Sequence, residues 1–403
     1  MSETTTERVP SFPMERRCPY APPAEYDELR AENPVTKVEL PTGRQAWALT
    51  RHEDVRAMLA DPRFSSDRMS PQFPTLVDNT QLRSTFRPSL ISMDPPEHGP
   101  ARRAVVGEFT VRRMEALRPR IQEIVDQAID DLLAAGEPAD LVTHVSLPVP
   151  SLVICEQLGV PYADHDFFQQ HSSKLLNRET AQEDRRDAVD QLTSYLGKLI
   201  TEKEAAPTDD LLGRQIVKQR EEGKVDHEAL VSLAFLLLVA GHETTANMIS
   251  LGTVALLEHP DQLALLLNDP GVTLNAVEEL LRYFTIAELA TTRVATEDVE
   301  IGGVLIRAGE GVLGLSNAAN HDPAAYDRPD ELDIARGARN HVAFGFGAHQ
   351  CLGQNLARME LQIVFDTLFR RVPGLRIEKP IDELDYKRNS TVYGLHSLPV
   401  AWS

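Results

Sequence analysis

The chain has 403 residues, enough for a large hydrophobic core, and 61 acidic against 41 basic side chains give a formal net charge of −20. That charge argues against nonspecific binding to nucleic acid. Its three cysteines, Cys18, Cys155 and Cys351, form no disulfide framework and suit a reducing compartment. The polar N-terminus lacks the apolar core of a signal peptide, and no apolar run approaches the ~20 residues of a membrane span. We therefore expect a soluble, cytoplasmic protein that does not associate with membranes.

Two short strands are predicted near the N-terminus, over Val35–Leu40 and Ala46–Thr50, with a glycine-containing turn between them. The next segment, His52–Ala60, has the pattern of a helix that ends before a proline. Residues 65–90 are irregular and rich in proline and polar side chains. A loop of this length in a compact chain is usually functional or mobile.

A basic pair follows this irregular stretch. Asp94, which precedes two prolines, predicts a helix start, and His98 and Arg102 lie four residues apart on one face of that helix. Taken alone, the pair indicates only a solvated basic face.

Residues 115–205 are predicted to form helices broken at Pro148, Pro150 and Pro161. Cys155 lies in an apolar run within this region, and we interpret it as part of the core. The stretch Ala163–Thr193 is polar and helical, which is typical of a pair of surface helices.

The longest predicted helix runs from Asp226 to His259 without a proline. Its first half is apolar on all sides, which indicates a helix buried in a large core. Residues 240–245 in its middle read Ala-Gly-His-Glu-Thr-Thr. The threonine hydroxyls are expected to bond back to carbonyls one turn earlier. Burying Glu243 costs free energy unless its carboxylate is paired or reaches water.

Beyond the long helix, Glu279 and Arg282 are three residues apart and would pair along a helix. This pair alone is weak evidence for any function. A strand carrying Arg293 is expected next, followed by a hairpin with a two-residue turn at Gly302-Gly303.

A glycine-rich loop holding Cys351 leads directly into a predicted helix. At a helix N-terminus the free N–H groups and the helix dipole favour a thiolate, the form of cysteine that binds metals. A lone cysteine is more often a small buried hydrophobe, but Phe344 and His349 nearby argue against that interpretation. The glycines would let the loop lie against a broad, flat group. They are Gly345, Gly347 and Gly353.

These motifs, in this order, resemble those of the cytochromes P-450, the heme-thiolate monooxygenases. The loop matches the family pattern Phe-x-x-Gly-x-x-x-Cys-x-Gly, residues 240–245 match the oxygen-groove motif, and Glu279 with Arg282 matches the Glu-x-x-Arg motif. The resemblance covers about residue 20 to the C-terminus and is closest to the soluble bacterial members.

The resemblance implies a mainly α fold, a single domain over 1–403 that has an extended segment at 1–20, a long central helix and a smaller β-rich part. Heme b would lie between that helix and the cysteine loop, with Cys351 as the metal ligand. The cofactor-binding residues implied are His98, Arg102, Ala240, Arg293, Phe344, Gly345, His349 and Gly353. Four of them would hold the propionates, namely His98, Arg102, Arg293 and His349. Arg336 would join Glu279 and Arg282 in a structural network.

The resemblance also implies the reaction, insertion of one atom of O2 into a C–H bond of a hydrophobic small molecule such as a polyketide, terpenoid, steroid or xenobiotic. Glu243 and Thr244 would be catalytic, as groups that deliver protons. The substrate pocket would be lined by Leu236, Val239, Ala240, Leu289 and Val392.

Electrons must come from another protein, because the sequence has no dinucleotide-binding or iron–sulfur motif. A ferredoxin and a ferredoxin reductase are the implied partners of a monomer. Arginines near the cysteine loop could form a basic docking face for the ferredoxin. They are Arg112, Arg113, Arg339, Arg358, Arg370 and Arg371.

Three alternatives were weighed against this interpretation. A peroxide-using relative typically alters the acid–threonine pair, whereas Glu243 and Thr244 are both present. A heme sensor or carrier has no need for a buried acid and threonine at this place. A zinc protein is disfavoured because no Cys/His cluster has ligand spacing.

Overall fold

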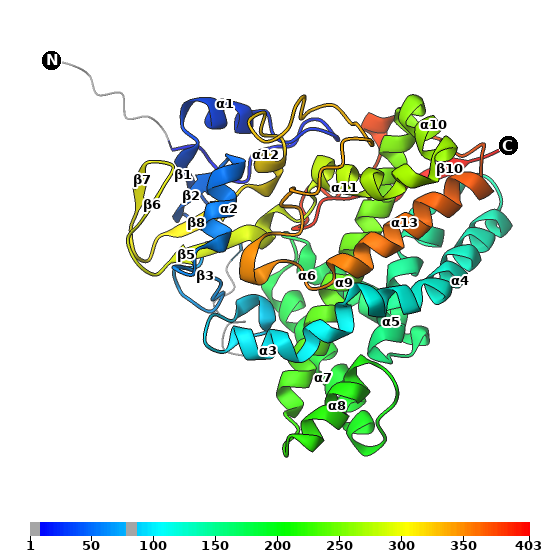
Figure 1. The fold of residues 1–403 in the computed structure, drawn as a ribbon, viewed down its shortest axis with the longest axis horizontal. Helices are drawn as coiled ribbons and strands as arrows, with labels where there is room; N and C mark the ends of the chain where they lie inside the picture. Colours follow the sequence, from blue (N-terminus) through cyan, green and yellow to red (C-terminus); the bar gives the residue numbers. More distant parts are fainter. Residues whose placement is uncertain (1–8, 78–86) are drawn as a thin grey trace.

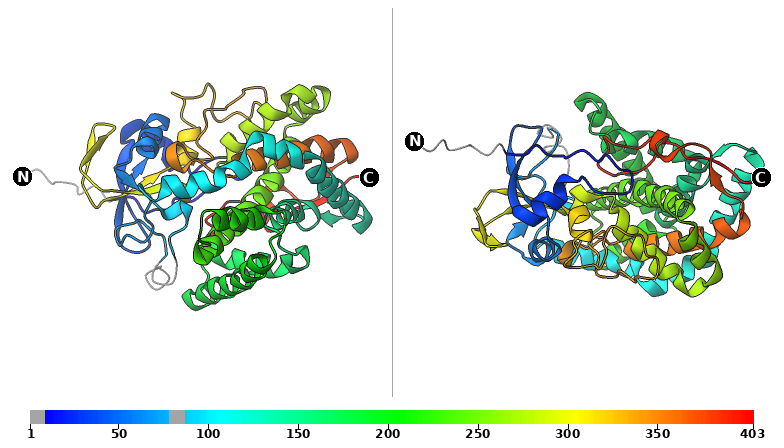
Figure 2. Two further views of the ribbon diagram at one scale, coloured as in Figure 1. Left: turned by 60° about the horizontal axis from the view of Figure 1, so that its bottom comes forward. Right: turned by 90° about the horizontal axis from the view of Figure 1, so that it is seen from above.

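The computed structural model describes residues 9–77 and 87–403. Helices form one large part, and short strands gather in a smaller part at one side, which gives the roughly triangular outline of Figure 1. The turned views show the same division (Figure 2). The predicted mainly α fold with a smaller β-rich part is confirmed.

The longer helices are α1 (Glu25–Glu32), α2 (His52–Ala60), α3 (His98–Val105), α4 (Val111–Ala135), α5 (Pro148–Leu158), α6 (His165–Leu176), α7 (Gln182–Ala205), α8 (Leu211–Glu221), α9 (His227–Glu258), α10 (Pro260–Asn268), α11 (Thr273–Phe284), α12 (Ser316–Asn320) and α13 (Gln354–Arg371). The strands are β1 (Val35–Glu39), β2 (Gln45–Leu49), β3 (Phe64–Ser65), β4 (Ala139–Asp140), β5 (Thr292–Ala295), β6 (Val299–Ile301), β7 (Val304–Ile306), β8 (Gly311–Gly314), β9 (Arg376–Ile377) and β10 (Pro399–Ala401).

The strands form three small sheets. The largest has the order β1-β2-β8-β5-β3, so strands from the N-terminal region pair with strands near residue 300. In the β6–β7 hairpin Ile301 pairs with Val304, and Gly302 and Gly303 take φ angles of 57° and 78°. Both turn residues therefore need the left-handed region that glycine adopts without strain. The predicted hairpin and the two predicted N-terminal strands are confirmed.

Helix α9 is the central element and crosses behind α13 and α11 in Figure 1. Asp226 caps it by accepting a hydrogen bond from the Ala229 N–H at 3.1 Å. The helix packs against α5, α7 and α13. From His242 onward nearly every side chain is buried, but the first half, contrary to expectation, leaves one stripe open. Residues on this stripe, including Leu236, Ala240 and Thr244, are at least partly accessible.

In the described part of the chain, only α9 has the length and hydropathy of a membrane span, and half of its most apolar window is buried inside the protein. Because it packs on several other helices, we assign it to the core. Helix α9 thus separates two apolar clusters, one around α4, α11 and α13 and one around α5, α7 and α8.

Two sequence expectations were wrong in detail. Helix α3 begins at His98, after a turn, because the Asp94 carboxylate binds elsewhere and accepts hydrogen bonds from Ser65 and Ser66. Pro148 and Pro150 do not break a helix but form the first turn of α5, where their missing N–H groups have no helical partner to lose.

Helix α11 carries a buried ion pair. Arg282 donates two hydrogen bonds of 2.8 Å to the Glu279 carboxylate, and both side chains are fully buried. Arg336 donates to the same carboxylate at 3.1 Å. The remaining Arg282 N–H groups reach the carbonyls of Asn320 and Pro329, so this network fixes the long segment that precedes the cysteine loop.

Removing the carboxylate should therefore be strongly destabilising. We expect Glu279→Gln to lower the free energy of unfolding by about 3–5 kcal/mol, because the fully buried guanidinium of Arg282 and the partly exposed one of Arg336 lose their counter-charge. Glu115→Gln is the matched control, since Glu115 pairs with Arg118 at the same spacing on the exposed face of α4, and it should cost less than about 1 kcal/mol. Urea unfolding measures both; equal losses would contradict this account.

Candidate active site

The cysteine loop connects the Arg282 network to α13. The Cys351 N–H donates to the Phe344 carbonyl at 2.8 Å, which closes the loop, and Gly345 and Gly347 take φ angles of 68° and 71°. A Cβ on Gly347 would lie 2.5 Å from the Leu59 carbonyl oxygen, so this glycine permits close packing on α2. A Cβ on Gly353 would meet nothing within 4 Å. The side of the loop at Gly353 therefore faces open space, as a broad bound group requires.

A single carboxylate clamps the two ends of this loop. Glu278 of α11 lies 3.0 Å from Nε2 of His341 and accepts hydrogen bonds from Arg358. Burial acts to raise the pKa of Glu278, but the hydrogen bonds from His341 and Arg358 hold it at about 2. Arg358 also lies over the Phe344 ring, 4.6 Å from its centre. Two residues on opposite sides of Cys351 are thus tied to one buried group, which fixes the loop.

Cys351 itself sits just before α13, and its sulfur accepts hydrogen bonds from the backbone N–H groups of Gly353 and Gln354. The Cys351 side chain is accessible to solvent, yet other parts of the protein surround it on all sides. The thiol therefore faces an internal space. Burial raises the pKa of the thiol, and the N–H groups and the guanidinium of Arg102 only partly offset this effect. The expectation that the helix N-terminus alone makes a thiolate was wrong, since desolvation dominates. A bound metal cation would hold the sulfur deprotonated.

Four basic side chains meet beside Cys351. The rings of His98 and His349 stack with their centres 4.0 Å apart, and burial with neighbouring positive charge lowers the pKa of His349 to about 3. Burial likewise lowers the pKa of Arg293 on β5 to about 10. Arg102 donates to the Gln350 carbonyl at 2.5 Å.

This basic cluster, His98, Arg102, Arg293 and His349, lacks an anion. Among the described residues, none of the four has a carboxylate within ion-pair distance, and the buried Nε2 of His98 has no hydrogen-bond partner. The nearest acid, Asp94, is engaged by Ser65 and Ser66. Arg293 is buried and Arg102 is half-buried, and neither has a counter-ion among the described residues. Positive charge in such a place is costly, so the cluster is built to receive an anionic group.

The open stripe of α9 lies close to the loop. Leu352, next to Cys351, packs against the apolar cluster that contains Leu237, Leu238 and Val239 of α9. The Thr244 hydroxyl donates to the Ala240 carbonyl at 2.8 Å, as the sequence predicts. Ala240 is exposed although it lies in the middle of the central helix. The stripe therefore borders an internal space.

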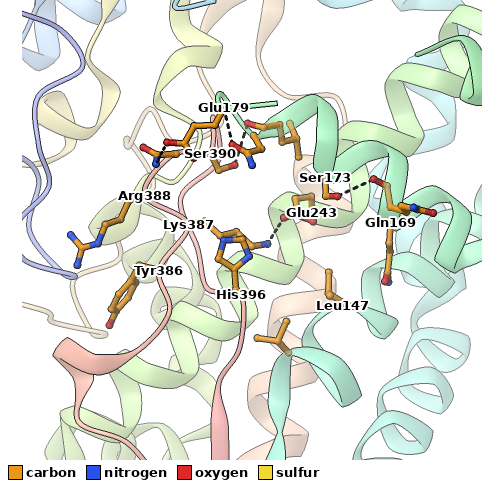
Figure 3. Close-up of a pocket in the computed structure, with 15 residues that line it drawn as sticks. Leu147, Gln169, Ser173, Glu179, Glu243, Tyr386, Lys387, Arg388, Ser390 and His396 are labelled. Carbon is orange, nitrogen blue, oxygen red and sulfur yellow. Dashed lines mark hydrogen bonds and ion pairs between the residues drawn. The ribbon is translucent and has the colours of Figure 1, made fainter. Parts of the chain in front are cut away.

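Glu243 points to another side of α9. Its carboxylate contacts the ammonium of Lys387 (Figure 3). It also lies 3.5 Å from the amide nitrogen of Asn247. Burial acts to raise the pKa of Glu243, but the positive charge of Lys387 outweighs it and lowers the pKa. The pair forms part of the wall of a polar cavity of about 540 Å³, together with Gln169, Ser173 and other side chains. No pattern in the sequence points to Lys387, which is 144 residues from Glu243.

The residues expected to line a substrate pocket lie in different surroundings. Leu236 and Val239 are partly accessible on α9, and Leu289 lines a second cavity. Val392 is buried in the main apolar cluster, whereas its neighbours Thr391 and Tyr393 line that second cavity.

Comparison with known proteins agrees with this arrangement. Residues 271–373 match the family model "Cytochrome P450". The chain is 51% identical to pentalenic acid synthase of Streptomyces avermitilis, with 99% of both chains covered, and 48% identical to vitamin D3 dihydroxylase of Streptomyces griseolus, with 98% of both covered. It superposes on the crystal structure of cytochrome P450 MoxA from Nonomuraea recticatena with a TM-score of 0.91 and 59% identity over 98% of each chain.

The chain therefore belongs to the cytochrome P450 family and is a P450 monooxygenase. This family works with heme iron, and the residues present fit that group. The basic cluster suits two propionates, Gly353 leaves room for a flat ring, and the Cys351 sulfur is the soft donor beside that room.

The Glu243–Lys387 pair gives a pH-dependent prediction. Without the lysine, burial outweighs the smaller effects of His242 and Asn247, and the pKa of Glu243 should rise above the unfolded value of about 4.3. Lys387→Met should then cost about 3 kcal/mol of stability at pH 7, and the loss should shrink as pH falls toward 5 and the carboxyl takes up a proton.

Urea unfolding at several pH values measures this difference from the wild-type protein. Lys379→Met, at an exposed lysine, is the control and should show no such trend. A loss for Lys387→Met that stays constant with pH would contradict the assignment of the charge on Glu243.

Proposed function

We propose that this monooxygenase hydroxylates a bulky, hydrophobic small molecule in the cytoplasm, with heme b ligated by Cys351 and electrons supplied by a ferredoxin and its reductase. The observation that carries the proposal is a lone, enclosed cysteine thiol beside a buried basic cluster without an anion. The names of the relatives, a pentalenic acid synthase and a vitamin D3 dihydroxylase, support a terpenoid or steroid-like substrate.

The residues that would hold the cofactor act in two groups. Cys351 would provide the axial thiolate, and heme with this ligand supplies the activation of O2. His98, Arg102, Arg293 and His349 would donate hydrogen bonds to the propionates, which would also supply the counter-charge that Arg102 and Arg293 lack among the described residues.

Two residues of α9 would move protons. The Glu243 carboxylate lies between a polar cavity and the open stripe, so it can exchange protons with water on the cavity side. The Thr244 hydroxyl lies on the open stripe and donates its hydrogen bond to the Ala240 carbonyl. Its oxygen can therefore accept a hydrogen bond from a water molecule. Lys387 keeps Glu243 charged and ready to accept a proton.

The thiolate assignment is tested by the spectrum of the carbon-monoxide complex. We expect the reduced wild-type protein to show the strongly red-shifted Soret band of thiolate ligation and Cys351→Ala to lose it. Cys155→Ala is the control, because Cys155 is buried in an apolar cluster and should leave the band in place. If Cys351→Ala kept the band, the ligand would be another residue.

The proton-delivery roles are tested by coupling. Thr244→Ala should consume reductant at nearly the wild-type rate but release most of it as hydrogen peroxide, because the water molecule that the Thr244 hydroxyl would hold is no longer positioned to deliver a proton. Glu243→Gln should slow turnover by about 10²–10⁴, the usual effect of losing a proton-transfer group.

Product and peroxide per reductant consumed are the measurements, made with a substrate found by product screening. Thr253→Ala is the matched control, since the Thr253 hydroxyl makes the same bond one turn back but is buried. Unchanged coupling in Thr244→Ala would show that this threonine has another role.

Most of the arginines proposed to attract a ferredoxin are paired with acids. Four of them contact carboxylates, namely Arg113, Arg358, Arg370 and Arg371. The other two, Arg112 and Arg339, are exposed and have no carboxylate in ion-pair range within the described residues. The start of α4 adjoins the cysteine loop, because Asn355 donates to the Phe109 carbonyl. Of the six arginines, only Arg112 and Arg339 therefore remain as candidates for attracting a ferredoxin.

Electron transfer should slow as salt rises, because exposed charges are screened over a Debye length of ~8 Å at physiological ionic strength. Charge reversal at Arg112 and Arg339 should raise the apparent KM for an acidic ferredoxin about tenfold. Reversal at the exposed Arg376, which pairs with Glu378, is the control. Electron-transfer rates that change neither with salt concentration nor with charge reversal at Arg112 and Arg339 would contradict docking at this face.

A further inference from the structure

A second cavity, of about 580 Å³, lies between segments that are far apart in the sequence. Its wall combines the N-terminal segment, the end of α6 with its following loop, the segment before β5, the start of α12 and the C-terminal segment. We call it the Arg16 cavity, and its main lining residues are Phe12, Arg16, Arg178, Leu289, Asn317 and Tyr393. Leu289, expected to line the substrate pocket, is part of this wall and lies four residues before Arg293 of the basic cluster.

The wall of the Arg16 cavity carries polar atoms that have no hydrogen-bond partner among the described residues. Four of its side chains each bury a polar atom that has no hydrogen-bond partner within residues 9–77 and 87–403. Two are donors, Nη1 of Arg16 and Nε of Arg178, and two are oxygens, Oε1 of Glu288 and Oδ1 of Asn317. Asn317 is only 2% exposed, so water at the surface does not serve it. Together these atoms form a set of donors and acceptors on one wall that a polar ligand can satisfy.

The cavity also has an excess of positive charge. In the described chain Arg16, Arg178 and Arg388 have no carboxylate in ion-pair range, while Lys387 is already paired with Glu243. Other contacts hold these arginines in place. Arg16 stacks on Tyr393 at 4.0 Å, Arg178 donates to the Arg388 carbonyl at 2.8 Å, and Arg388 donates to the Arg16 carbonyl at 3.0 Å.

Glu288 is a buried acid of the same wall and, within the described residues, forms no ion pair. Burial raises its pKa, while one of its oxygens accepts a 2.9 Å hydrogen bond from Tyr26. When protonated, a carboxyl group can donate a hydrogen bond to an anion instead of repelling it. The apolar part of the wall, which includes Phe12, Leu76 and Leu289, would suit a hydrocarbon body.

We propose that the Arg16 cavity binds the carboxylate of an amphiphilic organic acid, with Arg16 and Arg178 as donors to the carboxylate and Asn317 as acceptor for a ligand hydroxyl. The inference rests on the proposed function, because this acid is the substrate whose apolar body extends toward the cysteine loop. It narrows the substrate class from hydrophobic molecules in general to hydrophobic acids.

The test is equilibrium binding to the purified holoenzyme by titration calorimetry, with two matched pairs of probes. One pair is decanoic acid and decan-1-ol, and the other is lithocholic acid and its methyl ester. The wild-type protein should bind the acid of at least one pair about tenfold more tightly than its uncharged partner, the usual effect of a charge-assisted hydrogen bond. Arg16→Gln and Arg178→Gln should each remove most of this preference and leave binding of the uncharged partner unchanged.

Arg17→Gln is the matched control, because Arg17 is exposed, adjacent to Arg16 and paired with Glu15 and Glu25. Arg178→Lys keeps the charge and should keep part of the preference, which separates a lost charge from a misfolded wall. Equal binding of acid and uncharged partner in both pairs, no binding of any probe, or an equal loss in Arg17→Gln would overturn the proposal. An acid preference without oxygenated product would instead contradict the proposed function alone.

Discussion

The arrangement of this protein depends on a buried basic cluster that has no acid of its own. His98 comes from α3, Arg293 from β5 and His349 from the cysteine loop, so three separate parts of the fold deliver hydrogen-bond donors to one place. The lowered pKa values of His349 and Arg293 show that burial at this place disfavours their charged forms. An apoprotein built this way is stabilised by an anion, and Cys351 lies where a metal carried by the same molecule could be bound. The cluster thus couples cofactor binding to the stability of the β-rich part.

Buried acids on two helices hold the rest of the site around this cluster. Glu278 and Glu279 are neighbours on α11, yet one clamps the cysteine loop through His341 and Arg358 and the other holds Arg282 and Arg336. Glu243 on α9 differs, since its partner Lys387 opens onto a polar cavity (Figure 3). The first two acids are closed off, as structural groups should be, and the third keeps access to solvent, as a proton-transfer group needs.

The sequence predicted the elements whose patterns are local. The α9 helix, the β6–β7 hairpin and the helix after Cys351 follow from caps, glycine turns and apolar spacing, and all three are confirmed. The Glu279–Arg282 pair was readable from its spacing, but its burial was not, because burial depends on the distant segment near Asn320.

What the sequence could not predict are contacts between distant segments. Lys387 reaches Glu243 across 144 residues, and Glu278 was not distinguished from any other helical acid. Desolvation also reversed one inference, since the pKa of Cys351 rises even though a helix N-terminus lies beside it. The Arg16 cavity likewise has no local signal, because its wall is assembled from segments that are far apart in the sequence.

The central claim, that the basic cluster holds the cofactor's propionates, is tested most directly by reconstituting apoprotein with heme and with its dimethyl ester. Soret titration gives the dissociation constant of each. We predict at least about tenfold tighter binding of heme by the wild-type protein, from charge-assisted hydrogen bonds, and a smaller preference in Arg293→Gln. Equal affinity of the wild-type protein for heme and its diester would contradict the claim.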